Sequence, residues 1–185
     1  MTIFTPAIKL FTLRERPWSD FNFPRWQAWA VIVAIGLLAG LDPAMRVNMP
    51  MPLWTAVLFG VLMLVASFPV LVICLKWWMK RGGRWNGDGN LFNLIAASSL
   101  VADILGSGLV ALGVPMLLTL PLWLYSVWVN ANALSGAIPN ASLGYSIGGI
   151  LLCLIPVTLV IMVLGAVFFG TLAVAGMMPA QLVPN

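Results

Sequence analysis

The chain contains no histidine, only two cysteines and few charged side chains, with nine Lys and Arg and five Asp and Glu among 185 residues. Without histidine, and with so little cysteine, the usual zinc, haem and Cys–His catalytic sites cannot be assembled. The sequence therefore predicts no enzyme and no cofactor. Cys74 and Cys153 both lie inside apolar runs, where we expect buried thiols rather than a disulfide.

Charged residues make up 8% of the chain and apolar residues 62%, whereas a soluble domain has about a quarter charged and about half apolar residues. So few charges cannot cover a water-soluble domain of this size, and the mean hydropathy of +1.04 agrees. We therefore expect an integral membrane protein. The pI near 9.6 does not indicate nucleic-acid binding, because the basic residues lie beside apolar runs, where anionic lipid headgroups are the expected partner.

Apolar stretches separated by Gly, Pro, Asn and charged residues predict five transmembrane helices. The last stretch is too long for one upright helix, so we expect a break or tilt near Pro156 or an overhang past Gly170. The predicted spans are 26–41, 52–75, 91–112, 115–134 and 145–170. The predicted fold is all-α: residues 26–177 form one polytopic membrane helix bundle, followed by a short tail at 178–185.

The first 25 residues mix apolar side chains with Lys9, Arg14 and Arg16 and continue into Trp18, Phe21 and Phe23. This composition is typical of a segment that lies in the headgroup region, with aromatic rings at the interface and cations near lipid phosphates. A flexible tail is the alternative interpretation. We do not expect a signal peptide, since no small-residue cleavage site follows.

The distribution of basic residues predicts the orientation. Four precede the first span, Arg46 alone lies between the first and second, four follow the second, and none lies beyond. Five spans would collect eight cations on one side and one on the other. The positive-inside rule then predicts a cytoplasmic N-terminus and a C-terminus on the outer side.

One ionisable residue, Asp103, lies inside a predicted span, on a stripe of small and polar residues. No Lys or Arg lies within any predicted span, so we expect a neutral carboxyl that donates a hydrogen bond. A packing residue that fixes helix register is favoured over a proton or ion relay, because a lone acid makes a poor pathway. The candidate intramembrane polar site comprises Ser99, Asp103, Ser107, Tyr125, Ser126 and Thr158.

A second polar group lies near the predicted cytoplasmic ends of the third and fourth spans, where it would line a shallow polar vestibule. This candidate inner-face polar cluster comprises Asp88, Asn90, Asn93, Asn130 and Asn132. A calcium loop is not favoured, because the later EF-hand ligands, including the terminal Glu, are missing. Capping of the third helix by Asn90 is the favoured role for that residue.

Two pairs of glycines, each four residues apart, predict close helix packing: Gly36 with Gly40, and Gly144 with Gly148. The spacing leaves open whether each pair contacts another helix of this chain or a second protein.

Two stretches, RWNGDGNLFNLIAAS at 84–98 and LWLYSVWVNANALSGA at 122–137, resemble a known family. The first is similar to the W-x-G-G-x-G-(S/N)-F-x-x-x-L-A-A opening of the third helix in the Yip (Ypt/Rab-interacting protein) superfamily. The second is similar to the fourth helix of bacterial Yip-like proteins. The resemblance extends over about residues 26–170 and implies a five-span protein of the bacterial cytoplasmic (inner) membrane. Eukaryotic members bind prenylated Rab GTPases, whereas the bacterial relatives have no assigned reaction, so the resemblance implies a fold rather than an activity.

Two functions are compatible with the sequence. The favoured hypothesis is a non-enzymatic membrane organiser or accessory subunit of a larger membrane complex, whose partner is another membrane protein or a second copy. The alternative is a small transporter or lipid-handling protein that uses Asp103 and the polar inner face. The first predicts a dry, tightly packed core, and the second a water-accessible cavity that reaches Asp103.

Overall fold

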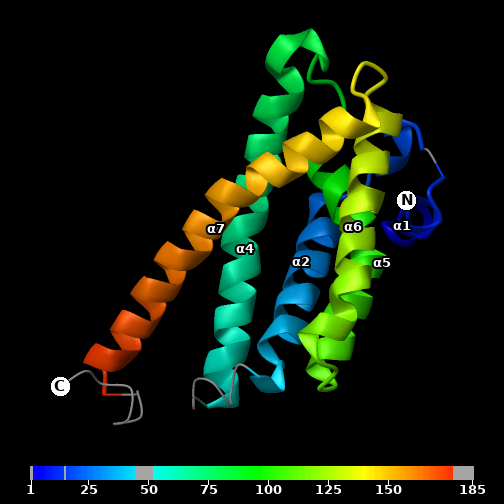
Figure 1. Cartoon of the computed structure of the whole chain (residues 1–185). Helices are drawn as coiled ribbons and strands as arrows, with labels where there is room; N and C mark the ends of the chain where they lie inside the picture. The colour runs from blue at the N-terminus through cyan, green and yellow to red at the C-terminus, as the bar shows by residue number, and fades with distance from the viewer. Residues whose placement is uncertain (1, 15, 45–51, 177–185) are drawn as a thin grey trace.

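The computed structural model describes residues 2–14, 16–44 and 52–176. Within these ranges the chain forms six α-helices and two short 3-10 helices, and no strand (Figure 1). Arg46 and the predicted tail at 178–185 lie outside the described residues. The α-helices are α1 (Phe4–Phe11), α2 (Arg25–Gly40), α4 (Leu53–Lys80), α5 (Leu91–Ala111), α6 (Met116–Ala137) and α7 (Leu143–Val174). The 3-10 helices are η1 (Trp18–Phe21) and η2 (Arg81–Gly83).

Four of these helices, α4 to α7, are long and apolar enough to cross a membrane. The predicted all-α membrane helix bundle is therefore confirmed, with four helices of spanning length rather than the predicted five. The apolar helix α2 has 16 residues, or about 24 Å at 1.5 Å per residue. This length falls short of a hydrocarbon core of about 30 Å.

Local sequence signals set the helix ends. Proline precedes the first residue of α2, α4 and α6, where a missing N–H costs no helical hydrogen bond. Asn90 caps α5, since its side chain accepts a hydrogen bond from the backbone N–H of Asn93, and Ser142 caps α7 in the same way. Gly113 follows α5 with φ +87°, the left-handed conformation that ends many helices.

The last helix, α7, is one uninterrupted helix of 32 residues with Pro156 inside it. The break considered near Pro156 is therefore absent, and α7 is instead strongly inclined to α4 (Figure 1). Its length of about 48 Å exceeds the hydrocarbon thickness. An inclined path accommodates the excess.

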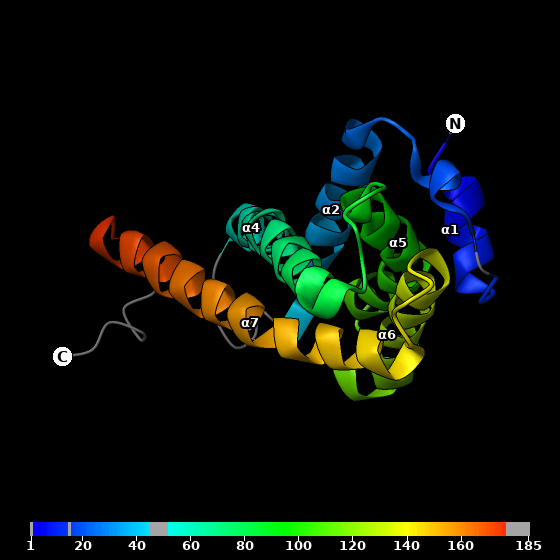
Figure 2. The ribbon, with the colours of Figure 1, turned by 90° about the horizontal axis from the view of Figure 1, so that it is seen from above.

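The most enclosed element is α5, in which every residue from 94 to 100 is buried. It packs against α2, α6 and α1, while α4 lies between α2 and α7. Seen from above, α1 lies at one side of the bundle and the C-terminal part of α7 projects at the other (Figure 2). The core thus lies around the N-terminal half of α5, and α7 forms an outer flank.

Glycines let α2 and α4 approach closely. A Cβ added to Gly36 would lie 2.8 Å from the Cα of Val61, and one added to Gly60 would lie 2.5 Å from the Gly36 carbonyl oxygen. The Gly36 and Gly40 pair therefore serves an intramolecular contact. Around Gly144 and Gly148, by contrast, a Cβ would meet no other atom within 4 Å.

Candidate functional site

Polar side chains of α5 and α6 form a buried hydrogen-bonded network, which we call the α5–α6 polar network. Ser126 Oγ donates to Asp103 Oδ1 at 2.6 Å, and Asn130 Nδ2 donates to the Ser126 carbonyl oxygen at 2.9 Å. Ser98 Oγ donates to Asn130 Oδ1 at 2.7 Å, and Ser99 Oγ lies 3.4 Å from the same oxygen. Asp103 is half-buried, and the other four side chains are buried.

Helical spacing brings these residues together. Ser99 and Asp103 are four residues apart on α5, and Ser126 and Asn130 are four apart on α6, so each pair lies on one helix face. The short connection between α5 and α6 makes the two helices antiparallel neighbours. Their polar faces therefore meet and satisfy one another away from water.

Of the residues expected beside Asp103, Ser126 donates a hydrogen bond to its carboxyl, with the two oxygens 2.6 Å apart. In this bond Asp103 Oδ1 accepts, and the neutral, donating carboxyl expected from the sequence stays a prediction. Tyr125 OH instead donates to the Phe11 carbonyl oxygen at 2.5 Å. Ser107 lies half-buried further along α5, and Thr158 is exposed on α7.

The inner-face asparagines do not share one vestibule, because Asn93 and Asn132 bind the backbone of the N-terminal segment. Asn93 is fully buried, and its Nδ2 donates to the carbonyl oxygens of Phe21 at 2.8 Å and Phe23 at 2.7 Å. Asn132 Nδ2 donates to the Leu13 carbonyl oxygen at 3.4 Å. Both side chains thus donate hydrogen bonds to backbone carbonyl oxygens that lie at the end of a helix or beyond it.

The remaining members of the inner-face cluster are also engaged elsewhere. Asn130 belongs to the α5–α6 polar network, and Asn90 caps α5. Asp88 lies in the loop before α5, where its carbonyl oxygen accepts from Trp85 Nε1 at 2.8 Å and its carboxylate from the Asn86 side chain.

Residues 2–14 and 16–23 dock on the bundle as a strap, which we call the N-terminal strap. Ile3, Ala7 and Leu10 are buried, and α1 packs on α5 and α6. The backbone N–H of Ile3 donates to Gln27 Oε1 at 2.9 Å. Outward-facing Phe4 and Ile8 are 62% and 58% exposed, so α1 presents an apolar face to its surroundings as well as to the bundle.

Sequence reasoning missed the docking of this strap, although one signal was available. Tyr125 and Asn132 are seven residues apart on α6, which places both on one face, and both donate to strap carbonyls. Polar residues two turns apart on one helix face are typical of a face that meets polar groups, here main-chain carbonyl oxygens at the end of α1 and just after it. The identity of those groups required the tertiary structure.

A second pair missed from the sequence joins the end of α4 to the start of α7. The rings of Trp78 and Tyr145 are stacked with centroids 4.9 Å apart. Trp78 Nε1 donates to the Tyr145 carbonyl oxygen at 3.1 Å, and Tyr145 OH donates to the Trp78 carbonyl oxygen at 2.7 Å. Gly149 leaves room for the indole, since an added Cβ would lie 2.7 Å from Trp78 Nε1.

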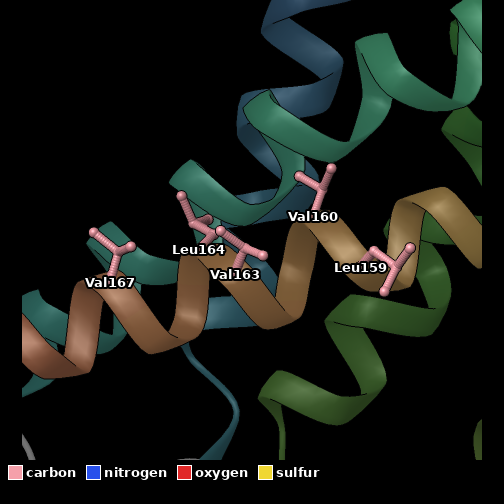
Figure 3. Close-up of a pocket in the computed structure, with 5 residues that line it drawn as sticks. All are labelled: Leu159, Val160, Val163, Leu164 and Val167. Atoms are coloured by element: carbon pink, nitrogen blue, oxygen red, sulfur yellow. The ribbon is translucent and has the colours of Figure 1, made fainter.

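An apolar hollow of about 360 Å³ lies along the middle of α7 (Figure 3). Its lining side chains are all aliphatic and all come from α7: Leu159, Val160, Val163, Leu164 and Val167. Such a surface suits an acyl chain or an apolar side chain rather than a polar substrate.

Within residues 2–14, 16–44 and 52–176, no three His, Cys, Asp or Glu side chains gather as a metal site would require. Both cysteines are free thiols, with Cys153 buried and Cys74 half-buried.

Comparison of the chain with family models, curated proteins and solved structures finds no match. The resemblance to the Yip superfamily therefore stays a hypothesis that rests on residues 84–98 and 122–137.

Proposed function

We propose that this chain is a five-span, non-enzymatic membrane protein of Yip-like type, acting as a membrane organiser or as an accessory subunit of a larger membrane complex. Its partner is another membrane protein or a second copy of the chain. In this proposal α2 also crosses the membrane, which brings the number of spans to five, and the bilayer thins locally around this short helix. Its position supports this, because α2 runs alongside α4 and packs on both α4 and α5 (Figure 1).

We place the N-terminus in the cytoplasm and the C-terminus outside, in a bacterial inner membrane. Support comes from the arrangement of the helix ends. The end of α4 and the turn between α6 and α7 lie at one end of the bundle, and the turn between α5 and α6 lies at the other (Figure 1). Four cations, at positions 76, 80, 81 and 84, follow the apolar part of α4 at the first end, which fits the positive-inside rule.

The observation behind the proposed role is the exposure of α7. In its most apolar 18-residue window 11% of the residues are buried, against 28–44% for α4, α5 and α6. Its exposed side chains are large and apolar, among them Ile155, Leu159 and Met162. A Cβ added to Gly144 or Gly148 would meet no atom of a neighbouring element within 4 Å. A helix with so little intramolecular packing offers its surface to lipid or to another transmembrane helix.

The test is purification from the native membrane in mild detergent, combined with substitutions on α7. Wild-type protein is expected to elute with a stoichiometric membrane partner or as a homo-oligomer. Bulky substitutions on the exposed face of α7, Ile155→Trp with Leu159→Trp, are expected to release that partner. Leu105→Trp with Leu109→Trp, at exposed positions of α5, is the matched control and should retain it. A wild-type protein that elutes alone as a monomer contradicts the proposal.

One observation favours the alternative of a small transporter or lipid-handling protein: a half-buried carboxyl, Asp103, is hydrogen bonded to Ser126 and so joins a polar network inside the bundle. Engagement of Asn93 and Asn132 by the N-terminal strap weighs against an open polar vestibule. Proteoliposomes assayed for proton flux and for lipid scrambling test this alternative. Asp103→Asn should abolish any such activity, and the exposed-site control Asp88→Asn should keep it. Full activity in Asp103→Asn contradicts a transport role for the carboxyl.

A further inference from the structure

The end of α4 concentrates positive charge. Four of the nine Lys and Arg residues of the chain fall within the nine positions 76–84. Lys76, Lys80 and Arg81 are exposed, and Arg84 is half-buried. We call Lys80, Arg81 and Arg84 the basic end cluster. Because it directly follows the apolar part of α4, it lies where a spanning helix leaves the hydrocarbon for the headgroup region.

Each cation of the cluster lies over an aromatic ring, with the ring centroid 4.1–5.9 Å from the charged group. Contact with an aromatic face holds a cation in place while leaving its outward side open to an anion. The pairs are Lys80 with Trp85, Arg81 with Trp77, and Arg84 with Tyr145.

Two of the three rings that support these cations are held by further contacts, whereas Trp77 is 54% exposed. Trp85 is buried and stacks on Trp18 of the N-terminal strap, with centroids 6.0 Å apart. Tyr145 is stacked on Trp78 and hydrogen bonded to it. Arg84 Nη1 also donates to the Asn140 carbonyl oxygen at 3.1 Å. Lys80 and Arg84 are therefore preorganised by contacts among α4, α7, the loops and the strap, which lowers the entropic cost of binding.

No carboxylate of the described chain neutralises the cluster. The one ion pair found in residues 2–14, 16–44 and 52–176 joins Arg16 and Asp20. Asp88, the acidic residue nearest in sequence, has its carboxylate bound by the Asn86 side chain. Among the described residues, therefore, no carboxylate pairs with these cations, and the positive charge at this end complements an external anion.

We propose that the basic end cluster binds the phosphate of an anionic phospholipid, with Lys80, Arg81 and Arg84 as the cationic ligands. Guanidinium groups match phosphate oxygens in geometry as well as charge. Exposed Ile73 and Trp77, 67% and 54% exposed, lie one to two turns before the cluster and give the acyl chains an apolar surface. A zwitterionic choline headgroup, with its own cation, fits this surface poorly. The site requires that this end lie at a membrane surface, and it depends neither on the orientation nor on the partner proposed above.

The experiment measures lipid binding to the purified full chain in nanodiscs of phosphatidylcholine with a minor share of phosphatidylglycerol, read by native mass spectrometry. Wild-type protein is expected to retain phosphatidylglycerol in excess of its share. Each cation near an anionic surface contributes about fivefold to binding. The triple variant Lys80→Gln, Arg81→Gln, Arg84→Gln should therefore lose about a hundredfold in affinity.

The matched control is Lys9→Gln, Arg14→Gln, Arg25→Gln, which removes the same charge from the N-terminal strap and the start of α2 and should keep the bound lipid. An equal loss of bound phosphatidylglycerol in both triple variants would mean that the general surface potential attracts the lipid, and would contradict a specific site. No preference for phosphatidylglycerol in wild type would also overturn it, whether or not the variants fold. Displacement of the lipid by millimolar inorganic phosphate would indicate a free-anion site instead. Binding is measured on the isolated chain, so these outcomes are separate from the test of a membrane partner.

Discussion

Asn130 is the residue at which the hydrogen bonds between α5 and α6 converge. Its side-chain oxygen Oδ1 accepts from Ser98 Oγ, and its side-chain Nδ2 donates to the Ser126 backbone carbonyl oxygen. Because these groups are buried, water cannot replace a lost hydrogen-bond partner. Each group left without a partner therefore destabilises the folded state.

Asn130→Ala is therefore expected to lower the free energy of unfolding by about 1–3 kcal/mol. Unfolding of the purified protein in mixed micelles by increasing SDS measures the change. The control is Asn140→Ala, since Asn140 is exposed and its backbone oxygen, rather than its side chain, accepts from Arg84. A loss in Asn130→Ala no larger than in the control would contradict the structural role of the network.

Glycine positions that look alike in sequence differ in their surroundings. A Cβ on Gly60 would lie 2.5 Å from the Gly36 carbonyl oxygen, whereas one on Gly148 would meet no atom within 4 Å. We expect Gly60→Ala to destabilise the bundle by about 1–3 kcal/mol through overpacking, and Gly148→Ala to cause no loss. Thermal unfolding in detergent compares the two. Equal stability of both variants would show that α2 and α4 are not in close contact.

At the scale of elements, α1 depends on its buried face for its place on α5 and α6. Adjacent residues separate the two faces, since Ala7 is fully buried and Ile8 is 58% exposed. A large side chain at position 7 has no room, while one at position 8 projects outward.

Ala7→Trp is therefore expected to undock α1 and speed tryptic cleavage after Lys9 by about fivefold or more, which corresponds to an overpacking cost of about 1 kcal/mol and above. Ile8→Trp, the matched control, should leave cleavage at the wild-type rate. The rate is followed by mass spectrometry of the released peptide. Equal rates in all three proteins would mean that the strap is not held by its buried face.

At the scale of the whole molecule, the proposed five spans place the loop before α5 and the turn after α6 on one side and the turn after α5 on the other. Single cysteines in a Cys74→Ala, Cys153→Ala background test this arrangement with a membrane-impermeant maleimide. In intact cells Leu112→Cys, at an 83% exposed position, should be labelled. Asn86→Cys and Asn140→Cys should be labelled only after the cells are permeabilised.

The same labels separate the competing topologies. One helix, α5, separates positions 86 and 112, and one helix, α6, separates positions 112 and 140. Labelling of all three positions from the same side would therefore mean that neither helix crosses the membrane, and would contradict the bundle. Labelling of Asn86→Cys and Asn140→Cys, but not Leu112→Cys, in intact cells would leave the bundle intact and reverse its orientation.

The sequence by itself determined that the chain is apolar enough for a membrane and where its long helices begin. The helices α2, α4, α5, α6 and α7 begin within two residues of the predicted span starts. A backbone in hydrocarbon must satisfy its own hydrogen bonds, so length and apolar composition suffice to specify a helix. The ends are less exact, because α4 continues to Lys80, beyond the predicted 75, where a helix can extend among lipid headgroups.

The tertiary structure decided which polar side chains meet. The sequence placed Ser99, Asp103 and Ser126 near one another, since helical spacing and a tight turn between two helices bring such residues together. It assigned Asn93 and Asn132 to a vestibule, whereas they hold the N-terminal strap. It could not pair Trp78 with Tyr145, 67 residues apart. Local pattern specifies elements because their hydrogen bonds are local, but side-chain partners across the bundle depend on how distant helices pack.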